Sequence, residues 1–300
     1  MPDHRTLREL VERELSEPVD PRVASMAAAI AAKHRTASRA VLFYGSCLRQ
    51  KQLDGLMLDF YLIVSDYRAA YAKRRLAAAN RMIPPNVFYF EHDGLVAKYA
   101  VLSEDHFRRE CGISARDPSI FARFAQPSRL VWTADDRARV MAVEAVANAA
   151  PTLLGLTRPS MSDAEASDVL NIWRRGFAFT YGAELRAERS SRPDSIVGID
   201  EARYRNFAAT AGFPRDMGYT PEQQRASLDA WRLFQRRGKR RQLMRLAKAS
   251  LTFAGGAEYI VWKINRHAGT DIKLKPWQRR HPLLAGLSLL PRLLKSGAVR

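Results

Sequence analysis

Two short stretches of the chain carry residues whose types and spacing suit chemistry on a phosphate. Gly45 and Ser46 follow an apolar run, and Asp59 lies inside the next one, between Leu58 and Phe60. A Gly-Ser turn lets backbone N–H groups approach a phosphate closely, because glycine has no Cβ and the serine hydroxyl adds a donor. A buried, ionised Asp59 needs a compensating cation or hydrogen-bond donors. The simplest partner is a divalent metal, so we expect Asp59 to hold Mg²⁺ against a phosphate at the turn.

This combination resembles the nucleotidyltransferase fold of polymerase-β-like enzymes, in which a Gly-Ser turn precedes a strand with metal-binding carboxylates. Those enzymes usually place two acids two residues apart on one strand face, whereas position 61 is Tyr in this chain. Asp54, Glu91 and Asp93 are candidates for a second carboxylate, among which the sequence does not choose. The alternative is a tight turn with a buried Asp59 that backbone donors satisfy.

Five apolar runs rich in β-formers predict the strands that position these residues. They cover 41–44, 56–64, 86–91, 95–102 and 129–133, with an Asp-Gly hairpin turn between the third and fourth. Helices are expected at 7–15, 21–33, 66–79, 104–110 and 119–125. From residue 135 onward the pattern is helical, at 135–150, 162–186, 200–211, 220–248 with an interruption at Gly238, and 251–265.

The sequence therefore predicts the α+β class, with three parts. Residues 1–134 form a mixed-sheet nucleotidyltransferase domain, and 135–276 form a helical domain that packs on it. Residues 277–300 form a Leu-rich tail flanked by Arg279, Arg280, Arg292 and Lys295, with Trp277 at its edge. Such a segment suits the lipid–water interface, and docking on the protein's own core is the alternative.

The net charge and its distribution along the chain indicate the class of binding partner. The net charge is +18, and the last hundred residues hold 21 Lys and Arg against 6 Asp and Glu. This imbalance predicts a polyanionic partner, either nucleic acid or an anionic membrane surface, with a solvated basic face as the alternative.

Cysteine content and hydropathy bear on the compartment. The two cysteines, Cys47 and Cys111, exclude a disulfide framework and suit a reducing compartment. We find no signal peptide, and no stretch of the ~18 apolar residues that a membrane span needs. The expected location is the bacterial cytoplasm, with the protein soluble or peripheral to the membrane.

Seven stretches, in order, resemble the mitochondrial-type phosphatidate cytidylyltransferases. These are peripheral CDP-diacylglycerol synthases, known as translocator assembly and maintenance proteins, with bacterial members. The stretches are YGSCLRQ (44–50), MLDFYLIV (57–64), PPNVFYF (84–90), GLVAKYAVLS (94–103), FARFAQP (121–127), YGAELR (181–186) and KASLTFAGG (248–256). The family tends to lack the second acid, in agreement with Tyr61. The chain departs from the family in a shorter turn, and in Cys47 and Ala249, where glycine is common.

The resemblance implies a reaction of CTP with phosphatidic acid that yields CDP-diacylglycerol and pyrophosphate. It implies Mg²⁺ as cofactor and action at the anionic inner face of the cell membrane rather than on nucleic acid. The implied catalytic residues are Asp59, as metal ligand, with Lys98 and Lys248 as phosphate neutralisers. The implied substrate-binding residues are Tyr44, Gly45, Ser46, Arg123, Glu184 and Arg186.

Some of these residue assignments have structural alternatives, and two other functions remain open. Lys98 also fits a solvent-facing strand position, and Glu184 with Arg186 also fits a structural ion pair. A nucleotidyltransferase acting on RNA accounts for the charge, although it leaves the Leu-rich tail unused. A catalytically inactive adaptor with this fold accounts for the missing second acid.

Overall fold

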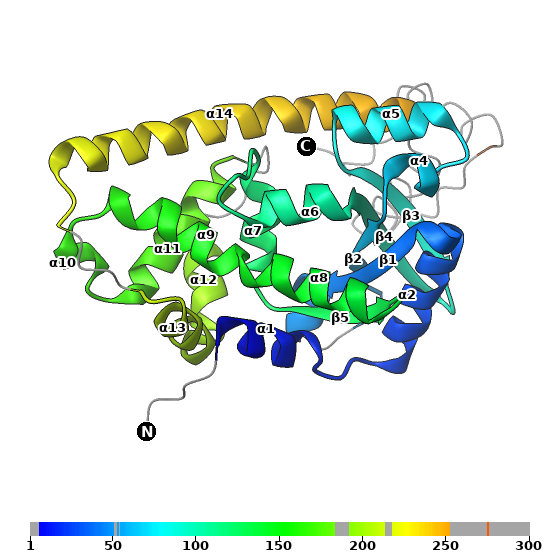
Figure 1. Ribbon diagram of the computed structural model, residues 1–300, viewed down its shortest axis with the longest axis horizontal. Helices are drawn as coiled ribbons and strands as arrows, with labels where there is room; N and C mark the ends of the chain where they lie inside the picture. The colour runs from blue at the N-terminus through cyan, green and yellow to red at the C-terminus, as the bar shows by residue number, and fades with distance from the viewer. Residues whose placement is uncertain are drawn as a thin grey trace, which may run out of the picture.

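The five β-rich runs form one mixed sheet with the order β3-β4-β2-β1-β5 (Figure 1). The strands are β1 (Ser38–Tyr44), β2 (Met57–Val64), β3 (Asn86–His92), β4 (Leu95–Ser103) and β5 (Ser128–Thr133). β2 runs parallel to β4, and every other neighbouring pair is antiparallel. The structure, a computed structural model, describes residues 6–50, 53, 55–183, 192–213, 218–252 and 275. The α+β class with a mixed sheet is confirmed.

Alternation along the strands gives the sheet two buried faces. One face, which we call the α2 face, bears Val41 and Phe43 and is covered by α2 (Pro21–Lys33), α4 (Tyr67–Ala70) and α5 (Arg74–Met82). The opposite face, the α7 face, bears Leu42, Tyr44 and Tyr61. It is covered by α1 (Leu7–Leu15), α6 (Glu104–Cys111), α7 (Pro118–Phe124) and α8 (Asp136–Ala147). Short helices η1 (Arg35–Ala37) and α3 (Ser46–Gln50) precede and follow β1.

After β5 the described chain is helical. The elements are α9 (Ala149–Thr157), η2 (Arg158–Ser160), α10 (Asp163–Ala166), α11 (Val169–Tyr181), α12 (Arg192–Gly198), α13 (Glu201–Thr210) and α14 (Pro221–Thr252). Trp173 lies at their centre, where its indole N–H donates to the Tyr204 carbonyl at 3.0 Å. One apolar cluster includes residues of these helices and of the α7 face, so the two parts share a core.

Two predicted helices are each divided in the structure. The helix expected at 66–79 becomes α4 and α5, because Tyr71 is extended and places its ring in the core against His34. The helix expected at 162–186 becomes α10 and α11, because the Asp168 carboxylate accepts the backbone N–H of Leu170 and starts a new helix.

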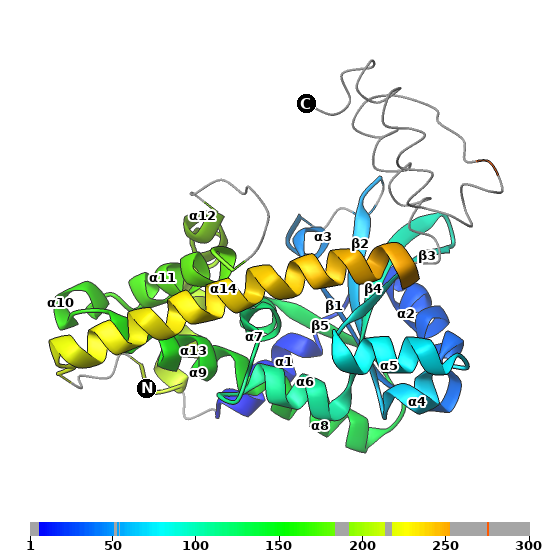
Figure 2. The same cartoon turned by 90° about the horizontal axis from the view of Figure 1, so that it is seen from above.

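The interruption expected at Gly238 is wrong, because α14 continues through it and spans the molecule from the helical half to the sheet (Figures 1 and 2). A Cβ on Gly238 would lie 2.9 Å from the Ala183 Cβ and 3.0 Å from its carbonyl oxygen. The glycine therefore permits close packing and does not end the helix. Most of the helix expected at 251–265 lies outside the described residues.

The expectation that no stretch could span a membrane also needs correction. Residues Asp136–Ser160 are long and apolar enough to do so by length and composition. More than half of their most apolar window is buried inside the protein, with Ala142 and Leu153 fully buried in the shared core. The apolar character of this stretch is therefore explained by its place in the core.

Candidate functional site

One row of side chains crosses all five strands on the α7 face. The strand registers pair Ser128 with Tyr44, Tyr44 with Asp59, Asp59 with Lys98, and Lys98 with Tyr89. Paired residues of neighbouring strands point to the same face, so this row brings together an acid, a base and two phenols. The sequence separates these residues by up to 84 positions, from Tyr44 to Ser128. Only the registers align them.

The Gly45 turn lies directly against the Asp59 carboxylate. Gly45 has a φ of +99°, in the region that favours glycine. A Cβ at this position would be 2.9 Å from Asp59 Oδ2. The turn and the carboxylate are therefore in contact, as the Gly-Ser pattern predicts, and the glycine is required for two separate reasons. Ser46 follows at the exposed start of α3.

Asp59 has a cationic partner within the chain, namely Lys98. The Lys98 Nζ lies 3.0 Å from Asp59 Oδ1, with side chains 30% and 18% exposed. The contact is an ion pair but not a hydrogen bond. Asp59 Oδ1 is buried and has no hydrogen-bond partner within the described structure. Compensation by a cation is thus found, but the partner in this structure is Lys98. The buried oxygen retains a lone pair for another ligand.

Aromatic rings and Arg123 form the wall of the site beside Asp59. The Tyr44 and Tyr61 ring centroids are 5.3 Å apart, and the Arg123 guanidinium lies 4.9 Å from the Tyr44 ring centroid. α7 thus brings Arg123 next to Tyr44 of the row, and its role with substrate stays a prediction. Tyr61 occupies the position of the usual second acid and is fully enclosed. Burial raises the pKa of Tyr61, and the nearby Arg123 and Arg245 charges only oppose this, so the phenol stays protonated at neutral pH.

The two described candidates for a second carboxylate do not lie at Asp59. Glu91 accepts a hydrogen bond from the Tyr89 hydroxyl and lies two strands from β2, about 10 Å across the sheet. Asp93 accepts a hydrogen bond at 3.0 Å from a serine hydroxyl of α2. Asp54 lies outside the described residues.

Lys248 lies near the end of α14 and not in the row. Its ammonium donates to the carbonyl of Ile83, to that of Pro85 at 2.8 Å and to Asn86 Oδ1 at 3.0 Å. Burial and the adjacent Arg245 lower the pKa of Lys248 to about 8, so it is still largely charged at pH 7. Asn86 pairs with Val101, three residues beyond Lys98 on β4, which is about 10 Å along the strand. In this structure Lys248 anchors α14 to the turn before β3, and its proposed role with phosphate stays a prediction.

Two groups of predicted residues lie outside the described part of the chain. They are the Glu184 and Arg186 pair and the tail at 277–300. Conversely, our sequence analysis missed His106, Asp117, Arg241 and Arg245, which meet beside α14. Asp117 was detectable in part, because an Asp immediately before a Pro is a helix-start signal. Its carboxylate accepts the backbone N–H of Ser119 at 2.9 Å.

The donor set at Asp59 fits a metal that is held largely by its substrate. Within the described ranges, no group of three or more His, Cys, Asp and Glu side chains is arranged to hold an ion. Mg²⁺ is commonly bound by one or two carboxylates together with phosphate oxygens and water. Asp59, with its buried and unbonded Oδ1, can supply one such carboxylate. As far as the described residues go, a bound phosphate and solvent would supply the remaining ligands.

Comparisons with known proteins complete the description of the site. No family model matches this chain, and no curated protein matches it. Among solved structures the chain is similar to a nucleotidyltransferase-like protein from Exiguobacterium sibiricum 255-15, at 10% sequence identity over 92% of each chain, with a TM-score of 0.30. A likeness at this TM-score does not establish a shared fold or activity.

Proposed function

We propose that the protein is a nucleotidyltransferase of the phosphatidate cytidylyltransferase type, which joins CTP and phosphatidic acid at a membrane surface. The observation that carries this proposal is the contact of the Gly45 turn with the Asp59 carboxylate, beside Lys98. A turn that accepts phosphate next to an acid that accepts a metal is the minimum apparatus for nucleotidyl transfer. The choice of lipid and of cytosine rests on the seven stretches that resemble that family.

The residues of the row have distinct roles in this proposal. The backbone at Gly45 and Ser46 holds the triphosphate, and Asp59 would hold Mg²⁺, which neutralises phosphate charge when bound. Lys98 already carries its charge 3.0 Å from the same carboxylate. We expect this flexible lysine to move to a phosphate oxygen when the triphosphate enters, because the exchange leaves no charge unpaired. Arg123 lies on the Tyr44 ring at the side of the site, where a second anionic substrate can reach it.

The proposed chemistry needs no strong general base. An oxygen of the phosphatidate headgroup attacks the α-phosphorus of CTP, the bond to the bridging oxygen breaks, and pyrophosphate leaves. The second pKa of a phosphate monoester is about 6, so the nucleophile is already ionised at neutral pH. The protein has to hold two polyanions together and stabilise the leaving charge. A site with one acid beside Lys98 and Arg123 is suited to that task.

The experiment that tests this function is pyrophosphate release from CTP and Mg²⁺, with and without phosphatidate vesicles, beside ATP, GTP and UTP. We expect release only with CTP and phosphatidate together. Asp59→Asn should lower the rate by more than about 100-fold, the usual scale for losing one stabilising group at the reacting centre. Glu91→Gln is the matched control, because it removes another acid of the same sheet that lies two strands away. Its rate should stay near that of the wild type.

Other outcomes point to the alternatives. Release from CTP without lipid would favour an RNA acceptor, and tighter binding to RNA than to phosphatidate vesicles across a salt series would support it. No release with any nucleotide from a folded protein would favour an adaptor. Full activity in folded Asp59→Asn would remove the assigned role of that carboxylate.

A further inference from the structure

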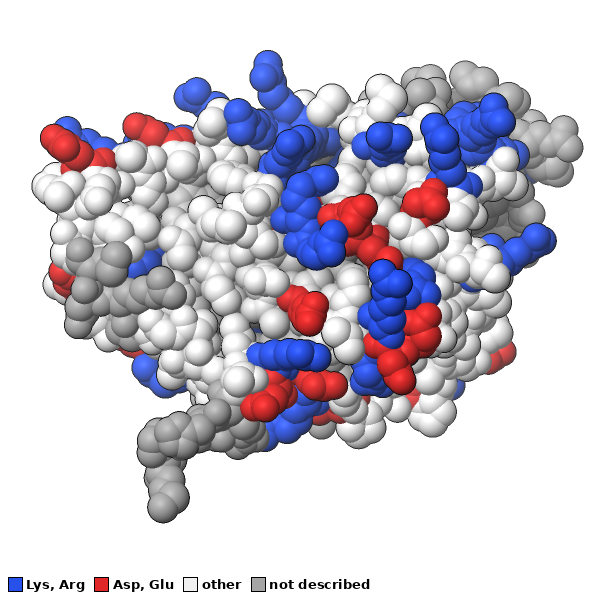
Figure 3. Space-filling view, in the orientation of Figure 1, with Lys and Arg blue, Asp and Glu red and all other residues white. Residues whose placement is uncertain are grey.

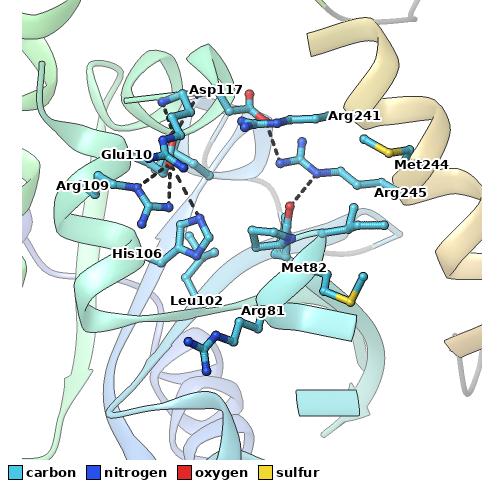
Figure 4. A pocket seen from close by; sticks show the side chains of 15 residues that line it. Arg81, Met82, Leu102, His106, Arg109, Glu110, Asp117, Arg241, Met244 and Arg245 are labelled. Atoms are coloured by element: carbon cyan, nitrogen blue, oxygen red, sulfur yellow. Dashed lines mark hydrogen bonds and ion pairs between the residues drawn. The ribbon is translucent and has the colours of Figure 1, made fainter. Parts of the chain in front are cut away.

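A second cationic site lies at the other end of the α7 face. A cavity of about 140 Å³ is enclosed by α5, α6 and α14 and by the loop before α7 (Figure 4). Leu102 of β4 forms part of its floor. Leu102 lies four residues beyond Lys98, about 13 Å along the strand, and neither Lys98 nor Asp59 lines the cavity. The cavity is therefore separate from the row that holds Asp59.

The lining of this cavity carries excess positive charge. Its charged side chains are Arg81, Arg109, Arg116, Arg241 and Arg245, with Glu110 and Asp117. Five arginines against two carboxylates leave three positive charges in excess.

Internal pairing uses only some of these arginines. Arg245 donates to Asp117 at 2.7 Å, and Arg109 donates to Glu110 at 3.0 Å. Arg241 is left 3.9 Å from a carboxylate that Arg245 already occupies. Within the described part of the chain, Arg81 forms no ion pair. Arg81 and Arg241 line the cavity from two different walls, α5 and α14 (Figure 4).

His106 shows that the cavity disfavours a further positive charge. Burial, followed by the charges of Arg109, Arg241 and Arg245, lowers the pKa of His106 to about 4. The Tyr67 hydroxyl lies 3.0 Å from Nδ1, and Glu110 lies 3.7 Å from Nε2. The ring is neutral at pH 7, and an anion that enters the cavity would favour its protonated form.

Two exposed methionines also line the cavity. Met82 of α5 is 79% exposed and Met244 of α14 is 45% exposed. Both methionine side chains are drawn at the cavity in Figure 4. Flexible thioethers next to guanidinium groups suit a ligand with an anionic head and an organic remainder.

We propose that this cavity binds a phosphate monoester, with Arg81 and Arg241 on its phosphate and Met82 and Met244 against its organic part. A dianion would neutralise two of the three excess positive charges, and guanidinium groups bind phosphate oxygens in bidentate fashion. The ligand is either a soluble phosphate ester or the headgroup of a lipid at the membrane surface. The site is independent of the nucleotidyl-transfer centre and goes beyond the function proposed above.

The test is binding measured by calorimetry at low ionic strength, without nucleotide or Mg²⁺, on wild type and four variants. Arg81→Gln and Arg241→Gln remove the two arginines assigned to the ligand, and each should weaken glycerol 3-phosphate binding about tenfold. Arg75→Gln and Arg240→Gln are matched controls, since each removes one exposed arginine from the same helix outside the cavity. Both controls should bind as the wild type does. Neither cavity variant disturbs the Arg245 to Asp117 contact, so folding should be retained.

Two further readouts complete the test. Saturating ligand should raise the pKa of His106 in an NMR titration of wild type, and Asp59→Asn should bind the ligand unchanged. Inorganic phosphate, glycerol 3-phosphate and vesicles containing phosphatidate form the three arms, and the tightest arm identifies the source of the phosphate. The proposal is overturned if no arm binds, if all four arginine variants weaken binding equally, or if His106 does not respond. Because no nucleotide is present, these outcomes are independent of the outcome for nucleotidyl transfer.

Discussion

Asp59 and Lys98 compensate each other across two parallel strands while both remain partly exposed. Lys98 compensates the Asp59 charge without a hydrogen bond to the buried Oδ1, while the Asp59 side chain as a whole stays 18% exposed. The same arrangement explains how the site tolerates Tyr61 in place of a second acid. With one carboxylate and one ammonium, the Asp59–Lys98 pair is neutral by itself.

Gly45 is the residue at which substitution should report most directly on this site. Gly45→Ala places a Cβ 2.9 Å from Asp59 Oδ2 on a backbone at φ +99°. We expect a loss of about 2–3 kcal/mol in unfolding free energy, combining backbone strain with displacement of the carboxylate, and a large loss of activity. Urea unfolding and pyrophosphate release measure the two effects.

Gly94→Ala serves as the control for that measurement. Gly94 also has a positive φ, +73°, but a Cβ there meets nothing within 4 Å. Its cost should be limited to backbone strain, about 1 kcal/mol, with activity retained. Equal losses of unfolding free energy in the two variants would show that the Asp59 carboxylate does not hinder a Cβ at position 45.

His106 predicts how stability changes with pH. The folded-state pKa of His106 is lowered to about 4, while an unfolded histidine titrates near 6.5. Between these values the unfolded chain binds more protons, so stability falls as the pH drops from about 6.5 toward 4. We expect a slope of about 1 kcal/mol per pH unit from this residue in urea unfolding. His106→Asn should have a shallower slope, and an identical slope would contradict the assignment.

At the scale of elements, α14 joins the helical half of the molecule to the edge of the sheet at three places. The Trp231 indole N–H donates to the Leu156 carbonyl at 3.0 Å near its start. Gly238 packs on Ala183 at its middle. Near its end, Arg245 donates to the Pro84 carbonyl at 2.7 Å, next to the Lys248 contacts. The helix therefore fixes one wall of the cationic cavity against the sheet.

Gly238→Ala tests the middle contact of α14. In an open helix this change stabilises by about 1 kcal/mol, but here the new Cβ would lie 2.9 Å from the Ala183 Cβ. We expect net destabilisation of about 1–2 kcal/mol in urea unfolding. Gly198→Ala is the control, because its Cβ meets nothing within 4 Å at the end of α12. That variant should be neutral or slightly stabilised, and a stabilised Gly238→Ala would show that the packing relaxes freely.

At the scale of the whole molecule, the positive charge is concentrated in the last third of the chain. Lys and Arg side chains gather along α14 (Figure 3), and the last hundred residues carry most of the net charge. Each basic residue near an anionic lipid surface contributes about 1 kcal/mol at modest ionic strength. The proposed lipid substrate remains in the bilayer, so this surface attraction would keep the enzyme near it.

Deletion of residues 277–300 tests the membrane role predicted for the tail. We expect weaker co-sedimentation with phosphatidate vesicles, because the deletion removes the Leu-rich segment together with its flanking Arg and Lys residues. The melting temperature should not change. A lower melting temperature with unchanged vesicle binding would instead indicate that the tail docks on the protein's own core.

The sequence by itself determined the parts of this protein that depend on local pattern. Strand-like runs predicted all five strands, and the Gly-Ser dipeptide before a strand acid predicted the turn that contacts Asp59. It also predicted that the chain becomes helical after β5. These features depend on the conformational preferences of neighbouring residues and on hydrophobic periodicity, which are present in any short window of the chain.

Only the tertiary structure decided which distant residues meet. Lys98 became the partner of Asp59 through the parallel register of β2 and β4, and Arg123 reached Tyr44 through the packing of α7. The packing of α14 places the Lys248 ammonium against backbone carbonyls, and five arginines from separate segments line one cavity. Strand register and helix packing are set by the fit of the whole core, and no local window of sequence contains that information.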